Sequence, residues 1–299
     1  MVTRSERYAS TLGASPGLDR ARVLVPIIRG QGAAPLLSLG DAIARSGSTQ
    51  GVVLGLVEIP SSRIGLQIAA TKRSRELLRW IAATDYERHA SEGGQLTVQT
   101  RIAADVARGI REATLETQSD MVLLEWPSQR SPRRHRLEAV MRSLATDPPA
   151  NLVIVRPDPA VNGPLAPRSI LAPLRGGSNA RLALSVAAAL ATQTGARLTL
   201  MHVYDNNHHP DRAQREAAVF HELIQAVRSL DPVVLEVIAD EPAAVLLRAG
   251  SEYDAVVMGA HADPNRTGVL VGSDLESVVN ELPRSVILTR STDTDTVAA

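Results

Sequence analysis

The 299-residue chain carries the same series of apolar segments twice. The segment RVLVPIIRG, with Pro26, resembles SILAPLRGG, with Pro173, at an offset of 147 residues. Further on, Asp120 in SDMVLLEW corresponds to Asp254 in YDAVVMGA, and the last apolar segments, NLVIVR and SVILTR, keep the same offset of 134 residues. The conserved order and spacing indicate two copies of one structural unit, with a length difference in the middle of the copy.

The two units are separated by the stretch RPDPAVNGPLAPR, Arg156 to Arg168. Its four prolines and one glycine disfavour both a helix and an internal strand, which is typical of a linker. Two units of about 140 residues are of ordinary domain size. We expect a flexible leader at 1–20, a degenerate first unit at 21–157, a linker at 158–168, a second unit at 169–292 and a flexible tail at 293–299.

Within the second unit, short apolar segments alternate with stretches of helical periodicity. This alternation predicts βαβ units with right-handed crossovers, and therefore parallel strands with helices on both faces. Aromatic residues make up only 2% of the chain, so the core is built from Leu, Val, Ile and Ala. We predict an α/β fold of two tandem open five-stranded parallel sheets, each in the order 3-2-1-4-5, and not one continuous sheet. The strands expected in the second unit are Ile170–Leu174, Leu198–Val203, Val233–Ala239, Ala255–Gly259 and Val286–Thr289.

Composition excludes several classes of function. The formal net charge of +0 gives no global attraction to nucleic acid or to an anionic membrane surface. The absence of cysteine excludes disulfides, thiol catalysis and cysteine-ligated zinc. No apolar run of about 18 residues predicts a membrane-inserted helix, and the N-terminus does not resemble a signal peptide, so a cytoplasmic location is expected. No nucleophile elbow or Walker A lysine is present, which argues against a dedicated enzyme; weak ATP hydrolysis stays open.

One loop of the second unit has the composition of a phosphate-binding loop. Ligands of open α/β sheets bind beyond the carboxyl ends of the strands, where strand order reverses. After the fourth strand come Gly259, two residues, Ala262, nine residues, and Gly272-Ser273. Gly259 lets the backbone turn beside a ligand without a Cβ. Gly272-Ser273 opens a helix whose free N–H groups and positive dipole end suit a phosphate.

This loop, with the strands ILAPL and LTLMHVYD, resembles the universal stress protein family, whose loop reads G-x2-G-x9-G-[ST]. The resemblance covers nearly all of 168–292 and, more weakly, 22–157, as in tandem members of that family. It implies a stress-response or regulatory protein that binds ATP or AMP and forms a homodimer of the tandem unit. It also implies that the fifth strands, Leu152–Val155 and Val286–Thr289, lie side by side. The site it implies places the adenine near Val203, Pro173 and Leu174, and the ribose and phosphates along Gly259, His261, Ala262, Gly272 and Ser273.

Arg175 is the main departure from the family pattern, because ATP-binding members usually carry an acidic residue there. Arginine does not hold ribose or a metal ion as an aspartate does, but it pairs with phosphate. Whether a metal accompanies the nucleotide therefore stays unknown.

The first unit lacks the loop. At the offset of 134 residues, the two glycines become Glu125 and Glu138, whose charges would repel a phosphate, and Ser273 becomes Ala139. We therefore expect at most one nucleotide site, in the second unit. The alternative is that the glycines serve tight packing. Because domains of this family also occur fused to membrane transporters, the alternative function is a nucleotide-free interaction module that regulates a partner such as a transporter.

Overall fold

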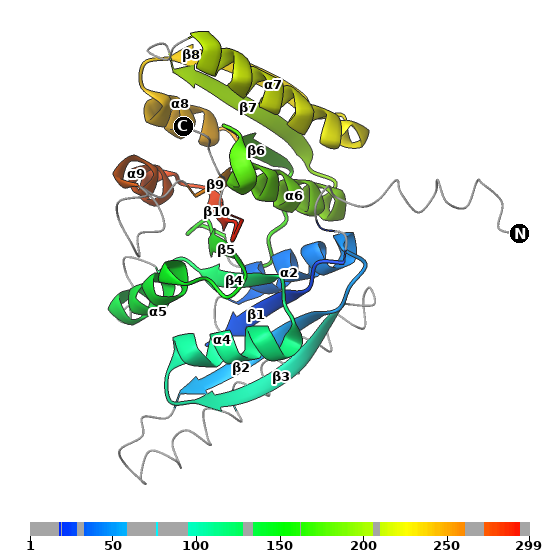
Figure 1. Cartoon of the computed structure of the whole chain (residues 1–299), viewed down its shortest axis with the longest axis vertical. Coiled ribbons are helices and arrows are strands. Elements are labelled where there is room, and N and C mark those ends of the chain that lie inside the picture. Colours follow the sequence, from blue (N-terminus) through cyan, green and yellow to red (C-terminus); the bar gives the residue numbers. More distant parts are fainter. Residues whose placement is uncertain are drawn as a thin grey trace, which may run out of the picture.

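The computed structural model describes residues 18, 20–28, 33–58, 76, 95–127, 134–161, 163–205, 210–260 and 272–293. In this part of the chain, ten strands form one sheet in the order β3-β2-β1-β4-β5-β10-β9-β6-β7-β8 (Figure 1). The strands of the first half are β1 Val23–Ile27, β2 Gly51–Glu58, β3 Leu96–Ala103, β4 Met121–Glu125 and β5 Asn151–Arg156. Those of the second half are β6 Ser169–Pro173, β7 Arg197–Asp205, β8 Val233–Ala239, β9 Ala255–Gly259 and β10 Ser285–Arg290.

Each half is a parallel sheet with the predicted order of strands. Read in chain order within a half, both run 3-2-1-4-5, and every pairing inside a half is parallel. All five strands predicted for the second unit are present, and β8 and β9 have the predicted bounds.

The two halves meet through their fifth strands, as the resemblance implied. Strands β5 and β10 pair antiparallel, with Ile287 opposite Val155. The expectation of two separate sheets is therefore corrected: the five-stranded sheets hydrogen-bond into one ten-stranded sheet. The physical reason is that both fifth strands are apolar and buried, so that an unpaired edge at either would expose N–H and C=O groups beside an apolar surface.

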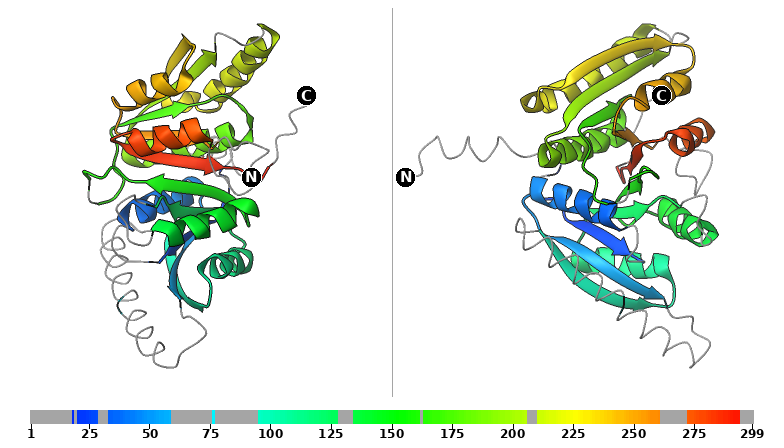
Figure 2. Two further views of the ribbon diagram at one scale, coloured as in Figure 1. Left: turned by 90° about the vertical axis from the view of Figure 1, so that its left-hand side faces the viewer. Right: turned by 180° about the vertical axis from the view of Figure 1, so that it is seen from behind.

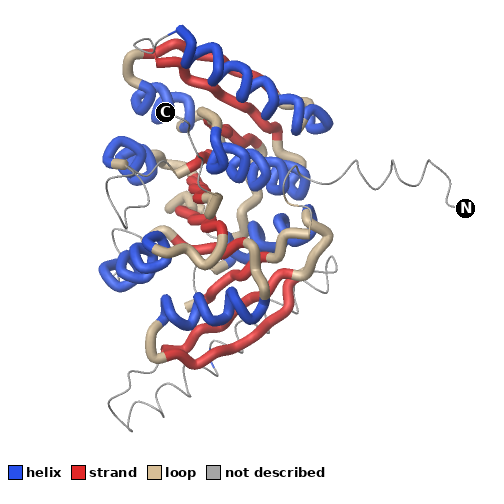
Figure 3. Tube along the Cα trace, in the orientation of Figure 1, coloured by secondary structure: helices blue, strands red, loops and turns tan. Residues whose placement is uncertain are grey.

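Helices cover both faces of the sheet (Figures 2 and 3). On one face lie α2 (Ala34–Ser46), α6 (Gly177–Thr194) and α7 (Pro210–Ala226). On the other face lie α4 (Val106–Thr117), α5 (Arg134–Thr146), α8 (Pro242–Gly250) and α9 (Ser273–Glu281). A short 3₁₀ helix, Arg228–Leu230, precedes β8. None of the helices in the described residues is long and apolar enough to cross a bilayer.

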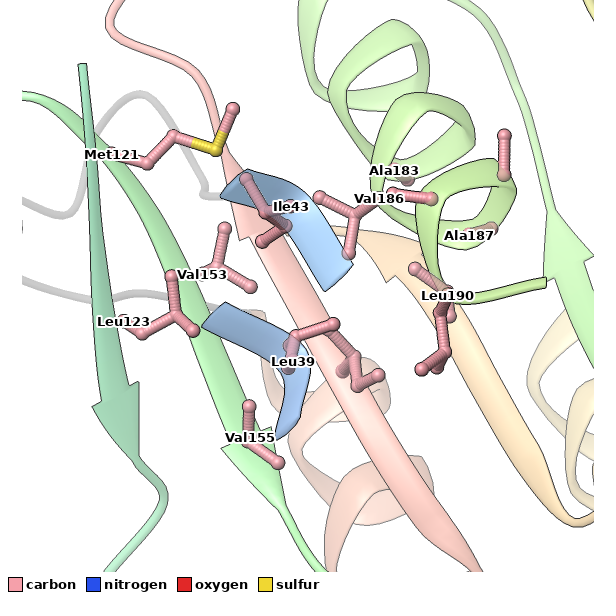
Figure 4. Packing of buried hydrophobic residues seen from close by; sticks show 14 of the residues in the cluster. Leu39, Ile43, Met121, Leu123, Val153, Val155, Ala183, Val186, Ala187 and Leu190 are labelled. Atoms are coloured by element: carbon pink, nitrogen blue, oxygen red, sulfur yellow. The ribbon is translucent and has the colours of Figure 1, made fainter. Parts of the chain in front are cut away.

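The apolar core forms one layer on each face of the sheet, and each layer contains residues of both halves. Figure 4 shows the boundary on the first face, where Leu39 and Ile43 of α2 lie between strands β4 and β5 and the residues Val186, Ala187 and Leu190 of α6. Helix α6 is rich in fully buried alanines, and small side chains let helices approach each other closely. The halves therefore share their core as well as their sheet.

On the second face, polar groups of the first half reach the end of helix α9. The Arg156 guanidinium donates hydrogen bonds to the carbonyl oxygens of Leu282 and, at 2.7 Å, Arg284. The Trp126 indole Nε1 donates to Asn280 Oδ1 at 3.3 Å. Burial lowers the pKa of Arg156 from its ordinary value. The Arg156 bond to Leu282 satisfies the carbonyl group of the C-cap residue of α9, one of those that a helix C-terminus leaves unpaired.

Candidate functional site

In the second half, strand order reverses at β6, which lies between β7 and β9. The connection after β6 leads to α6 on one face, and the connection after β9 leads to α9 on the other (Figure 1). The N-termini of α6 and α9 therefore open at the same carboxyl edge of the sheet. This is the position at which open α/β sheets bind ligands.

The turn between β6 and α6 is built from left-handed glycines. Gly176 has φ +108° and Gly177 has φ +83°, values that L-residues with a side chain rarely adopt. Leu174 is buried just before them, and its N–H donates to Met201 O at 2.8 Å. Arg175 is exposed at the turn. The structure therefore brings Pro173, Leu174 and Arg175 together at the carboxyl end of β6, just before the N-terminus of α6.

Asn179, in the first turn of α6, fixes that helix to the ends of β9 and β10. Its amide Nδ2 donates to Ala260 O at 2.7 Å, and its Oδ1 accepts from the backbone N–H of Ser291 at 2.7 Å. Its backbone oxygen accepts from Thr289 Oγ1 at 3.0 Å. Sequence reasoning missed Asn179. The only available signal was an amide side chain two residues after the glycine pair.

The absence of a Cβ at Gly259 makes this anchoring possible. A Cβ on Gly259 would lie 3.0 Å from the backbone carbon of Asn179 and 3.1 Å from its carbonyl oxygen. Contacts that short require the backbone of α6 to move. The glycine at the end of β9 is thus explained by packing, the alternative that the sequence had left open.

Helix α9 begins where the sequence predicted. Gly272 is its N-cap, with φ −66° and ψ 163°, and Ser273 is the first helical residue. Because Gly272 has no side chain, no side-chain cap hydrogen bond is made at this residue. First-turn amides of a helix are donors to which an anion binds. The predicted residues His261 and Ala262 lie outside the described part of the chain.

The predicted adenine side of the site lies on β7. Val203 is buried, two residues beyond Met201, which pairs with the last residue of β6. Beside it, His202 is fully buried. Its Nδ1 lies 2.6 Å from the Leu174 carbonyl oxygen, and its Nε2 lies 3.9 Å from a carboxylate oxygen of Glu216. His202 thus connects β7 to the β6–α6 turn.

The first half differs at the equivalent position. Glu125 ends β4 as Gly259 ends β9, as the offset predicts, and it is exposed. Helix α5, however, begins at Arg134, so Glu138 lies inside the helix and not at its start. A hydrogen bond from Arg134 lowers the pKa of Glu138. Glu138 and Gly272 therefore do not occupy equivalent positions in the structure. Helix α5 begins earlier in the first half than α9 begins in the second half.

Residues 167–290 match the model of the Universal stress protein family. The second half is a universal stress protein domain.

The tandem fold recurs in solved structures. A universal stress protein from Archaeoglobus fulgidus is 17% identical with a TM-score of 0.63, and the match covers 92% of this chain and 98% of that one. The cytoplasmic domain of a prokaryotic cation chloride cotransporter is 14% identical with a TM-score of 0.51, covering 91% and 95% of the two chains. At these identities the likeness establishes the fold alone, in which two halves of similar architecture are joined in one chain.

A sequence relative extends the comparison over both halves. The Na⁺/H⁺ antiporter NhaS5 of Synechocystis sp. is 25% identical over 276 residues, which are 91% of this chain and 39% of the antiporter. The chain thus spans well under half the length of this curated relative.

Proposed function

We propose that the chain is a regulatory module that acts on a cation transporter. The observation that carries this proposal is that the resemblance to the antiporter extends over 276 residues, and so over both halves and their shared core. The structural similarity to the cytoplasmic domain of a cation chloride cotransporter, which also extends over both halves, supports the proposal. A module of this kind acts by binding its partner from the cytoplasmic side, and it requires no chemistry of its own.

We further propose that an adenine nucleotide, ATP or AMP, binds the universal stress protein domain and signals to this module. Support comes from the carboxyl ends of β6 and β9, which the N-termini of α6 and α9 follow, and from Arg175, which is exposed just after β6. The helix termini supply N–H donors, and Arg175 supplies a guanidinium that pairs with phosphate. Asn179 and Gly259 have a structural role in this site. The side chain of Asn179 is already hydrogen-bonded within the protein, and Gly259 packs against the backbone of Asn179.

Calorimetric titration with ATP and AMP tests the nucleotide proposal. One site per chain is expected, and Gly272→Glu is expected to abolish binding because it places a carboxylate at the start of α9. At an effective dielectric constant of about 20, a like-charge pair near 4 Å costs on the order of 4 kcal/mol. Half of that still weakens binding more than about tenfold. The variant retains its helix, since a carboxylate at a helix N-terminus is stabilising.

The control is Glu138→Ala, which removes a carboxylate from the residue that the sequence offset of 134, but not the structure, aligns with Gly272. Because Glu138 lies within α5 and is paired with Arg134, the variant is expected to bind with unchanged stoichiometry. Two equivalent sites, or full binding by Gly272→Glu, would contradict the assignment.

Transport assays test the regulatory proposal. Membrane vesicles from cells that lack the chain are loaded with a pH-sensitive dye, and cation–proton exchange is measured as purified chain is added with and without ATP. A saturable change in the exchange rate is expected, with heat-unfolded chain as the control. No change at any concentration would count against the proposal.

A further inference from the structure

Strand β8 forms one outer edge of the ten-stranded sheet, and its sequence, VVLEVIA, is almost entirely apolar. Ile238 is 72% exposed, Val233 is 42% exposed and Val234 is 38% exposed. An edge strand presents a row of unpaired N–H and C=O groups, and natural proteins usually protect such edges with charges, prolines or bulges. β8 has neither a proline nor an internal positive charge.

The helices of the second half leave β8 partly uncovered. Side chains alternate between the faces of a strand, so Val234, Glu236 and Ile238 lie on one face and Leu235 and Val237 on the other. The second set packs partly against the core layer that includes α8. The first set faces the side of α7, and the core layer on that side contains no residue of β8.

The single charge of β8 is directed back to the protein. The Tyr204 hydroxyl, on the neighbouring strand β7, donates to Glu236 Oε2 at 2.7 Å. A carboxylate engaged by its own sheet is less effective in repelling an approaching strand than a charge that projects from the edge.

The opposite edge of the sheet, β3, has a different character. Four of the eight residues in its sequence, LTVQTRIA, are polar. The Arg101 guanidinium pairs with Glu116 and, at 3.3 Å, with Glu112, both on helix α4. The Glu112 and Glu116 side chains of this cluster are 46% and 63% exposed, and exposed charges beside an edge strand discourage edge pairing. The two ends of the sheet therefore differ, with one polar edge and one apolar edge.

We propose that β8 is the dimerisation surface of this protein and pairs antiparallel with β8 of a second copy of the chain. The chain already joins its own halves by antiparallel pairing of two apolar edges, β5 and β10, and this contact leaves neither of those edges for a partner. A strand related to itself by a two-fold axis is self-complementary, and one apolar edge per chain gives a closed dimer and not a filament. With a formal net charge of +0, two copies meet without long-range repulsion.

The register follows from Glu236. An axis through Glu236 would place two carboxylates opposite each other, and like charges directly opposite are destabilising. An axis through Leu235 or Val237 instead places each Glu236 opposite an apolar residue, Val234 or Ile238. We therefore assign the axis to one of these two positions.

Light scattering on the full chain tests the surface. The wild type is expected at twice the one-chain mass of 31.9 kDa in the micromolar range. Ile238→Lys and Val234→Lys are expected to raise the dimer dissociation constant by about tenfold or more, because each places a charge in an apolar contact. Ile102→Lys is the matched control, an isoleucine that is 65% exposed on the β3 edge, and it is expected to remain dimeric. All three side chains lie at the surface, and circular dichroism verifies that the variants are folded.

Crosslinking tests the register independently. Since the chain contains no cysteine, single cysteines at Leu235, Glu236 and Val237 report only on their own symmetry mates. Disulfides require Cβ atoms about 4 Å apart, so oxidation is expected to link Leu235→Cys or Val237→Cys chains more efficiently than Ile102→Cys chains. A monomeric wild type, or a dimer that survives Ile238→Lys and gives no β8 crosslink, would overturn the proposal.

Discussion

Gly259 lies where the backbone of α6 comes closest to strand β9. A Cβ there would lie 3.0 Å from the Asn179 backbone carbon, and forced overpacking typically costs about 1–3 kcal/mol. Gly259→Ala is therefore expected to lower the free energy of unfolding by about that amount, measured by urea denaturation. The loss should be the same with and without ATP if the glycine serves packing. Glu125→Ala, at the exposed end of β4, should change stability by at most about 0.5 kcal/mol.

Tyr204 predicts a loss of stability in alkaline solution. Burial, and then the hydrogen bond to Glu236, raise the pKa of Tyr204 from 10.0 to about 12. Between these values the unfolded chain has lost the phenolic proton and the folded chain retains it, so stability falls as pH rises from about 10 to 12. Tyr204→Phe should flatten this part of the stability profile, and Glu236→Gln should shift it to lower pH. Phenolate absorbance provides the direct titration, and a Tyr204→Phe profile identical to wild type would exclude this cause.

Single residues show what the sequence could and could not predict about the candidate site. Gly259 and Gly272 stand at a strand end and a helix start, as predicted, because such positions follow from local spacing and local backbone chemistry. The role of Asn179 depends on Ala260, Thr289 and Ser291, which are distant in the chain. Contacts between residues so far apart in the chain leave no periodic pattern in the sequence. The close packing that requires a glycine at position 259 could therefore be recognised only in the three-dimensional structure.

Secondary-structure elements were predictable where apolar runs have clear ends. β8 and β9 have the predicted bounds because polar and turn-forming residues flank each run. The alignment of Glu138 with Gly272 failed because the offset of 134 was carried across a connection whose length differs between the halves. Pro132, two residues before Arg134, was the available signal, since proline favours helix starts.

The contact between α2 and α6 gives a prediction at the scale of elements. Ala187 is fully buried in α6, beside α2 (Figure 4). Ala187→Leu adds three carbon atoms to a closely packed boundary and should destabilise the protein by about 1–3 kcal/mol. Ala244→Leu is the matched control on α8, where the alanine is exposed, and it should change stability by at most about 0.5 kcal/mol. Equal unfolding midpoints in urea for the two variants would show that the helix boundary tolerates expansion.

At the scale of the whole molecule, the repeat predicted two similar units but not their fusion. Periodicity identifies which strands are buried on both faces, and it says nothing about which edge pairs with which. Only the resemblance implied that β5 and β10 are neighbours, and the ladder between them makes one sheet of two. The two core layers, each shared by both halves, follow from that pairing.

The shared sheet and core predict that the two halves unfold together. Separating them would expose the apolar strands β5 and β10 and the buried faces of α2 and α6, so a partly unfolded chain loses much of the burial that stabilises its other half. Calorimetry should therefore give one transition whose calorimetric and van't Hoff enthalpies agree. Ala187→Leu, a change in the second half, should lower hydrogen-exchange protection in β1 of the first half as much as in β6. Two calorimetric transitions, with only one shifted by Ala187→Leu, would mean that each half is stable without the β5–β10 contact.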